Sequence, residues 1–404
     1  MIDLLKRIFR RKGVDKTIYV CVVILTVFGI VMIGSASVGQ TASEGTSFAT
    51  VNMIKQTVFV VSGFGFMIFL TRCFKRMWIN YKFVNIIFVV GIIALIICRF
   101  FSHANGSYAW IRLPGGFSLQ PAEFMKVIMI LFLAFYFGEM EEMCQIPKQL
   151  SRKEKEDLQI RKFRYCLGIP IAAIAITCFI ILFIQKDFGS AFILGFICLM
   201  MFFVTPRPYY TKYKKLAGIA LLVVVIVAGL TSTIFLKGYQ LGRIETWLHP
   251  TSDYTGSGFQ LTNGLIAFSN GGLLGRGFGA SKEKYGYIPE SHNDFIAPVI
   301  YEELGMVGFM LFMIPYIIII YKMFDYGMKM KETKCKLVLY GVGIYFFTHL
   351  FINIGGVSGL IPMTGVPLLL ISSGGSSTWA AMIALGIAQS MIARYNRDSL
   401  KEQI

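Results

Sequence analysis

Residues 18–36 read IYVCVVILTVFGIVMIGSA and contain no charged side chain. A helix needs about 20 apolar residues to cross the hydrocarbon core of a bilayer, so this stretch predicts a membrane-spanning helix. Nine similar stretches follow, at residues 56–71, 83–98, 122–138, 166–184, 188–205, 216–236, 295–321, 337–355 and 376–393. The sequence therefore predicts an all-α polytopic integral membrane protein with about ten transmembrane helices.

The overall composition supports this fold class. The chain has 404 residues, of which 55% are hydrophobic and 15% are charged. A soluble domain usually has about 25% charged residues, and a disordered chain has few apolar ones. The composition therefore excludes a soluble multidomain protein and a disordered chain.

The basic residues predict the orientation in the membrane. The net charge of +17 could indicate nucleic-acid binding, but its distribution argues against that. If the N-terminus is cytoplasmic, the cytoplasmic segments hold 29 of the 39 Lys and Arg residues. Those segments are 1–17, 72–82, 139–165, 206–215, 322–336 and 394–404. Because positive charge collects in cytoplasmic loops, we expect both termini in the cytoplasm and no nucleic-acid partner; the basic segment 6–16 could also contact anionic membrane lipids.

The expected organisation is a cytoplasmic basic N-terminus (1–17), a ten-span membrane domain (18–394) and a cytoplasmic tail (395–404). The longest connection, 237–294, joins spans seven and eight on the outer side. It is rich in Gly but too apolar for a disordered loop. An apolar run too short to span a bilayer predicts a re-entrant or interfacial helix within this loop.

Several ionisable residues lie at membrane depth, where burial is costly and function is common. Glu123 and Lys126 are three apart on one helix face, so they form an ion pair unless Lys126 faces a cavity. Asp187 lies in a tight turn and can cap the helix that follows. Glu302 and Glu303 lie about two turns into the eighth span, and we expect at least one to face the bundle interior.

Asp294 stands at the end of the long loop and at the start of the eighth span. Position alone favours a helix N-cap for this residue. The surrounding motifs change that interpretation. They are Trp110-Ile111, Gln120 to Lys126, Lys186 to Ala191, Gly286 to Ile296, Glu302 to Gly305, and Asn353 to Ser377.

In this order and spacing, the motifs resemble those of the SEDS family, which comprises the FtsW, RodA and SpoVE proteins. The resemblance covers residues 18–394. It implies a multi-pass protein of the bacterial cytoplasmic membrane that polymerises lipid II into glycan strands at the outer face. The strands would serve division, elongation or sporulation. The implied partners are lipid II, a class B penicillin-binding protein, and other membrane proteins of the divisome or elongasome.

The resemblance also implies a catalytic carboxylate. The family pattern Pro-Glu-x-His-Thr-Asp-Phe places it on Asp294. The other candidate binding or supporting residues are Trp110, Gln120, Glu123, Lys126, Asp187, Arg243, Lys282, Glu290, His292 and Glu302. The chain departs from the family at Ala109, Lys186 and Asn293, where Arg, Pro and Thr are usual. The loop 279–281 resembles FtsW or SpoVE and the segment 364–367 resembles RodA, so the subfamily stays open.

Lipid II polymerisation joins an undecaprenyl-pyrophosphate-linked sugar to a hydroxyl group with inversion. Such an inverting glycosyltransferase needs one general base, and Asp294 can supply it. Because pyrophosphate is a good leaving group, cations can replace a general acid. Arg243, Lys282 and Lys284 are candidates, as is a divalent cation such as Mg²⁺ or Mn²⁺. The alternatives are a lipid II flippase and a non-catalytic scaffold of the division or elongation complex.

Overall fold

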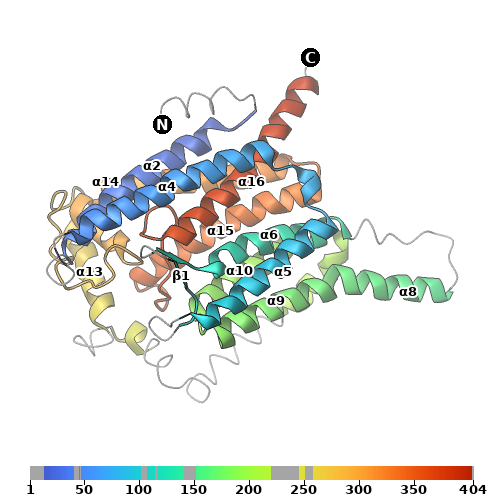
Figure 1. Ribbon diagram of the computed structural model, residues 1–404, viewed down its shortest axis with the longest axis horizontal. Coiled ribbons are helices and arrows are strands. Elements are labelled where there is room, and N and C mark those ends of the chain that lie inside the picture. Colours follow the sequence, from blue (N-terminus) through green and yellow to red (C-terminus); the bar gives the residue numbers. More distant parts are fainter. Residues whose placement is uncertain are drawn as a thin grey trace.

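The computed structural model describes residues 13–40, 45, 47–101, 107–113, 117–140, 152–219, 245–250 and 258–402. Long helices lie side by side in one bundle (Figure 1). In chain order the first five helices are α2 (Lys16–Val38), α4 (Phe48–Cys73), α5 (Tyr81–Ile97), α6 (Pro121–Gly138) and α8 (Arg152–Phe163). The others are α9 (Ile169–Phe179), α10 (Phe188–Val204), α13 (Phe259–Gly271), α14 (Ile296–Lys329), α15 (Thr333–Val357) and α16 (Gly375–Glu402).

The predicted all-α membrane fold is confirmed. Eight helices of the described residues are long and apolar enough to span a bilayer, and a bent pair, Phe188–Val204 with Pro208–Ile219, raises the number to nine. They match all the predicted spans except 216–236, most of which lies outside the described residues. The spans are longer than predicted at several ends, since α4 begins at Phe48 and α14 ends at Lys329.

The fifth span extends furthest beyond its prediction. Helix runs without interruption from Lys153 to Ile184, through two π turns, η3 (Arg164–Gly168) and η4 (Ile180–Ile184). The charged part, α8, projects from the bundle and is exposed along most of its length (Figure 1). Alternating charges suit a helix in water as well as a loop. The charged residues 153–163 therefore lie on an exposed helix outside the bundle.

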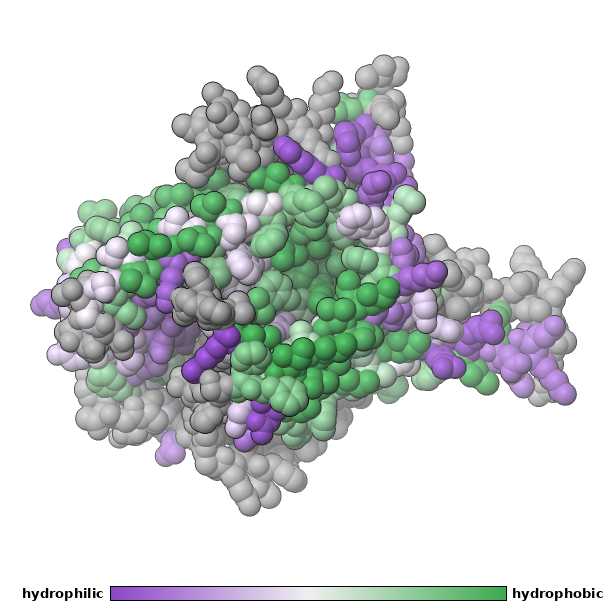
Figure 2. All heavy atoms as spheres, in the orientation of Figure 1, coloured by the Kyte–Doolittle hydropathy of each residue, from purple (hydrophilic) through white to green (hydrophobic). Residues whose placement is uncertain are grey.

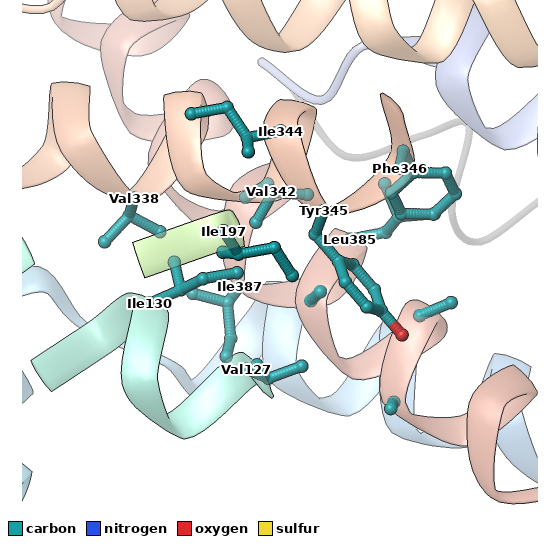
Figure 3. Packing of buried hydrophobic residues seen from close by; sticks show 14 of the residues in the cluster. Val127, Ile130, Ile197, Val338, Val342, Ile344, Tyr345, Phe346, Leu385 and Ile387 are labelled. Carbon is teal, nitrogen blue, oxygen red and sulfur yellow. The ribbon is translucent and has the colours of Figure 1, made fainter. Parts of the chain in front are cut away.

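Three helices form the centre of the bundle. About 89% of the spanning window is buried in α6 and in α16, and 78% in α15, whereas α5 is only 22% buried. Figure 3 shows Val338, Val342 and Tyr345 of α15 gathered with residues of α6, α10 and α16. The outer helices expose apolar side chains, which appear as a green belt in Figure 2. This distribution is that of a bundle whose outer face meets lipid.

Two small elements join the helices at one end. Strands β1 (Ile111–Leu113) and β2 (Phe117–Leu119) form an antiparallel hairpin with Ile111 opposite Leu119. This hairpin was not predicted, because strands of only three residues carry too little alternation to be recognised in a sequence. The apolar run in the long loop forms α13, so the predicted short helix is confirmed as a helix, and its depth in the membrane stays a prediction.

Helix α14 is broken at Gly305, which has φ +62° and ψ −158°. The loop after α13 lies against this break and supplies its hydrogen bonds. Arg276 and Gly277 donate backbone N–H groups to the carbonyls of Glu302 and Glu303, both at 2.9 Å. In return, Met306 N donates to the carbonyl of Gly272 at 3.1 Å. The loop therefore satisfies the backbone groups that a break within a spanning helix would leave unpaired.

Replacing Gly305 by Ala is expected to destabilise the protein by more than about 2 kcal/mol. The backbone there is left-handed, and an added Cβ would lie 2.4 Å from the backbone nitrogen of Gly275. Thermal unfolding of the purified protein measures the change. Gly65→Ala is the matched control, because an added Cβ there meets no atom within 4 Å. Equal melting temperatures for Gly305→Ala and the wild type would contradict this interpretation.

Candidate active site

The loop end around Asp294 is held by helix α15. Asn353 donates its side-chain N–H groups to the carbonyl of Asp294 at 2.8 Å and to the carbonyl of Val366 at 2.7 Å. Phe295, the next residue, is buried and packs against Gly264 of α13. These contacts fix the backbone on both sides of the Asp294 carboxyl group.

The carboxyl group of Asp294 lies at a small hollow. The hollow is lined by Asp294, Asn353, Met363, Thr364 and Gly365, among others. An added Cβ on Gly365 would stand 3.7 Å from Asp294 Oδ2, so this glycine lies directly beside the carboxylate. Asp294 itself is partly exposed. Phe295 occupies the N-cap position of α14, so Asp294 lies one residue before that position.

Glu290 and His292 build the turn before Asp294. The backbone N–H groups of Asn293 and Phe295 both donate to the carbonyl of Glu290, and Asn293 Nδ2 donates to its carboxylate at 2.5 Å. Asn293, where the family has Thr, therefore supports the turn. The carbonyl of His292 accepts from Ser373 N at 3.0 Å, which joins the turn to the segment before α16.

The imidazole of His292 is mostly buried and lies edge-on against Phe48, with ring centroids 5.5 Å apart. Its Nδ1 is buried without a hydrogen-bond partner among the described residues. Burial lowers the pKa of His292 below its ordinary value of 6.5, although Glu290 opposes the shift. The folded protein therefore favours the neutral form of the His292 ring.

This pKa shift predicts a loss of stability in acid. A depressed pKa in the folded state contributes stability above pH 6.5 that is lost as the pH falls through the folded pKa. We expect the melting temperature to drop between pH 7.5 and pH 5.5, and His292→Gln to reduce that drop. The exposed His249 gives the control His249→Gln, which should keep the wild-type drop. An unchanged pH dependence of the melting temperature in His292→Gln would show that His292 does not cause the loss of stability in acid.

A second polar group surrounds Asp187. As predicted, Asp187 caps α10, accepting from Ser190 N at 3.0 Å. Gln120 Nε2 donates to the same carboxylate at 2.9 Å, and the Ser190 hydroxyl donates at 2.7 Å. The backbone N–H of Gln120 donates to Ser376 Oγ at 2.8 Å. Asp187 and Gln120 therefore tie α6, α10 and α16 together at one end. Lys186, where the family has Pro, adopts a left-handed φ of +58° in this turn.

The predicted ion pair of Glu123 and Lys126 is confirmed. Lys126 Nζ lies 2.7 Å from Glu123 Oε1 and 3.2 Å from His349 Nε2, and all three side chains are buried. The open alternative, in which Lys126 faces a cavity and binds pyrophosphate, is therefore not supported. Glu123 Oε2 is buried without a hydrogen-bond partner in the described part of the chain. This carboxylate oxygen could therefore accept a hydrogen bond from a donor group of a ligand.

The segment 359–374 connects the three groups of residues described above, which centre on Asp294, on Asp187 and on the pair of Glu123 and Lys126. His349 Nδ1 lies 3.2 Å from the carbonyl of Pro367, one helical turn from the contact between Asn353 and Val366. On its other side, Gly189 approaches the carbonyl of Thr364 so closely that an added Cβ would lie 2.9 Å away. His349 and Asn353 were not predicted as site residues. Their signal is a polar pair four residues apart in an otherwise apolar span.

The Gly-rich loop, which follows α13, contacts Glu302 and Glu303 of α14. Its lysines were predicted to neutralise the pyrophosphate of the substrate. Both Glu302 and Glu303 are buried, which confirms that this region faces the interior. Glu302 accepts from the Ser281 hydroxyl at 2.5 Å and from Lys282 N at 3.3 Å. Lys284 is 1% exposed and lies 2.8 Å from Glu303, so it is a buried structural cation and not a pyrophosphate ligand. Glu302 is likewise a loop anchor.

Two of the remaining candidates lie within the described residues, and the third lies outside them. Trp110 is partly buried just before β1, and Lys282 is exposed on the Gly-rich loop. Arg243 lies outside the described residues. Within the described ranges, no group of three or more His, Cys, Asp and Glu side chains could hold a metal ion.

Comparison with known proteins identifies the family of this chain. A family model described as cell cycle protein, for FtsW, RodA and SpoVE, matches residues 15–398. The chain belongs to the FtsW/RodA/SpoVE family. A relative from Bacillus subtilis (strain 168), named probable peptidoglycan glycosyltransferase FtsW, is 32% identical over 97% of this chain and 94% of its own length. Stage V sporulation protein E of the same strain is 33% identical over 72% of this chain and 73% of its own.

Solved structures of FtsW/RodA/SpoVE relatives share the fold. A chain from a peptidoglycan synthase complex aligns with a TM-score of 0.70 at 22% identity, covering 95% of this chain and 98% of that chain. The rod shape determining protein RodA of Thermus thermophilus aligns with a TM-score of 0.62 at 20% identity, covering 95% and 97%. This family member is therefore a multi-pass membrane protein with the architecture of RodA.

Proposed function

We propose that this chain is a peptidoglycan glycosyltransferase that polymerises lipid II, with Asp294 as the general base. One observation carries the assignment of the base. Asp294 is a partly exposed carboxylate at a small hollow, and Asn353 fixes its backbone. A base must be held at a defined position and remain accessible to substrate. The family membership and the named relatives support the activity.

In the proposed reaction, the acceptor hydroxyl oxygen attacks the anomeric carbon of the donor sugar. The new glycosidic bond forms as the bond to the pyrophosphate oxygen breaks, with inversion. The Asp294 carboxylate takes the hydroxyl proton, and the undecaprenyl pyrophosphate leaves with the bonding electron pair. Lys282, exposed on the Gly-rich loop, and Arg243 remain the candidate cations for that leaving group.

The orientation is part of the proposal. The concentration of Lys and Arg in the segments listed above supports two cytoplasmic termini and a site at the outer face. The similar fold of a chain from a peptidoglycan synthase complex supports a partner that crosslinks glycan strands, which we assign to a class B penicillin-binding protein. The division into residues 1–17, 18–394 and 395–404 stays a prediction, and α16 continues as far as Glu402.

The test is glycan-chain formation by the purified protein. The wild type is mixed with purified lipid II and a candidate class B penicillin-binding protein whose transpeptidase site is blocked. We expect long glycan chains, resolved by gel electrophoresis, that disappear on treatment with a muramidase. Lipid II that stays monomeric with every candidate partner would contradict the proposed activity.

A further inference from the structure

A large basic cavity lies at the end of the molecule opposite Asp294. It has a volume of about 540 Å³ and forms where α4 ends, α14 turns into α15, and α16 leaves the bundle. Its cationic lining residues are Arg72, Lys75, Arg76, Lys329, Lys331, Arg394 and Arg397. Among the described residues, the only acidic side chains in its lining are Glu332 and Asp398. A cavity with this excess of positive charge favours an anionic ligand.

The internal ion pairs leave part of this charge uncompensated. Arg76 pairs with Glu332, and Arg394 Nε lies 3.6 Å from Asp398. Arg72 and Lys75 are exposed at the mouth of the cavity and have no polar partner among the described residues. The carboxylates of the cavity are thus taken by other cations, and these two side chains are available to an added anion.

The cavity also has an apolar side. Phe74, Met330 and Met391 line it, and the short helix η1 (Arg76–Trp78) lies beside it. Met77 and Trp78 of that helix are 69% and 39% exposed. Exposed Trp beside cations is typical of the headgroup level of a membrane. Figure 2 shows hydrophilic residues gathered at this end of the molecule, next to the apolar belt.

We propose that this cavity binds the phosphate of an anionic phospholipid headgroup, with Arg72 and Lys75 as its principal cations. A phosphodiester matches the fork of a guanidinium and the point charge of an ammonium. The apolar wall and the exposed Met77 and Trp78 can cover the glycerol and upper acyl groups, which a free phosphate ion lacks. Basic pockets between spanning helices on the cytoplasmic side suit such headgroups.

The test compares lipid binding by the intact protein. Purified protein is exchanged into micelles with equal amounts of phosphatidylglycerol and phosphatidylcholine, and bound lipid is counted by native mass spectrometry. We expect a clear preference for phosphatidylglycerol in the wild type. Arg72→Gln/Lys75→Gln should lower that preference at least about tenfold, because each basic residue contributes separately to the attraction.

Two further variants keep the test specific. Lys212→Gln/Lys215→Gln removes two exposed lysines that are absent from the cavity lining, and it should retain the wild-type preference. Arg72→Lys/Lys75→Arg should also retain it, because the charge is unchanged. An equal loss in the Lys212 and Lys215 control would overturn the proposal in favour of a diffuse basic surface.

Two soluble competitors test whether the cavity binds an anion other than a phospholipid. sn-Glycerol 3-phosphate carries the phosphate without the acyl chains, and we expect it to compete weakly. Binding as tight as that of the lipid would overturn the lipid assignment in favour of a free phosphate. Binding of hexaglutamate in place of phosphatidylglycerol would instead identify the cavity as a docking site for an acidic protein segment.

Discussion

Replacing Asp294 by Asn is expected to lower the rate of glycan-chain formation from lipid II by at least about a hundredfold. The amide has nearly the shape of the carboxylate but does not take the acceptor proton. The contact of Asp294 with Asn353 is made by the backbone carbonyl of Asp294, so the substitution retains it. The measurement is the initial rate of polymer formation at matched protein concentration, together with the melting temperature of each variant.

The control for this prediction is Asp325→Asn. Asp325 allows the same chemical change at a different place. It lies in α14, near the end of that helix that is farther from Asp294, and it pairs with Lys329 at 2.7 Å. An exposed ion pair of this kind contributes about 0–1 kcal/mol, so the rate should stay near that of the wild type. A rate for Asp294→Asn within threefold of the control would contradict the role of Asp294.

The second large effect is expected from Lys284→Met. Lys284 Nζ contacts Glu303 at 2.8 Å, the carbonyl of Gly279 at 2.9 Å and Ser35 Oγ at 3.1 Å. Removing the cation leaves the Glu303 carboxylate buried without its charge partner. Breaking a buried pair in this way costs about 3–5 kcal/mol. We expect a correspondingly lower melting temperature and earlier proteolysis of the Gly-rich loop.

Two variants separate this explanation from a simple loss of packing. Lys329→Met removes a half-exposed lysine from the same helix bundle and should have little effect on the melting temperature. In Lys284→Met/Glu303→Gln the unpaired charge is absent, so this double variant should be more stable than Lys284→Met alone. A double variant less stable than Lys284→Met would refute the charge argument.

The fold class was predictable because spanning helices carry their own signal. An apolar stretch such as 18–36 has to be buried or to meet lipid, whatever its neighbours are. The ends were less predictable, because a helix continues into water when its side chains permit it. Segment 152–163 is the example, since its alternating charges extend the fifth span outward from the bundle.

The candidate site was predictable only in part. Asp187 and the pair of Glu123 and Lys126 have partners near in sequence or at a helix start, where local rules apply. The contact of Glu303 with Ser35 could not be predicted in this way, since Ser35 lies 268 positions away in the chain. The same holds for segment 359–374, whose contacts come from α10, α14 and α15.

The break at Gly305 shows the same limit. In the sequence, Glu-Glu-Leu-Gly reads as part of one apolar helix. The break depends on the backbone of the Gly-rich loop, which replaces the missing helical hydrogen bonds. The burial of Lys284 is a related case. A sequence does not reveal whether a loop lysine is buried, so Lys284 is indistinguishable there from a lysine that can reach pyrophosphate.

The most direct test of the central claim is the fate of lipid II in proteoliposomes with the protein in one orientation. Fluorescent lipid II is supplied only to the leaflet that faces the Asp294 end, with the blocked class B partner present. The account predicts glycan chains on that leaflet with the wild type, none with Asp294→Asn, and no lipid II on the opposite leaflet. Lipid II that crosses the bilayer without forming chains would contradict the account and support a flippase.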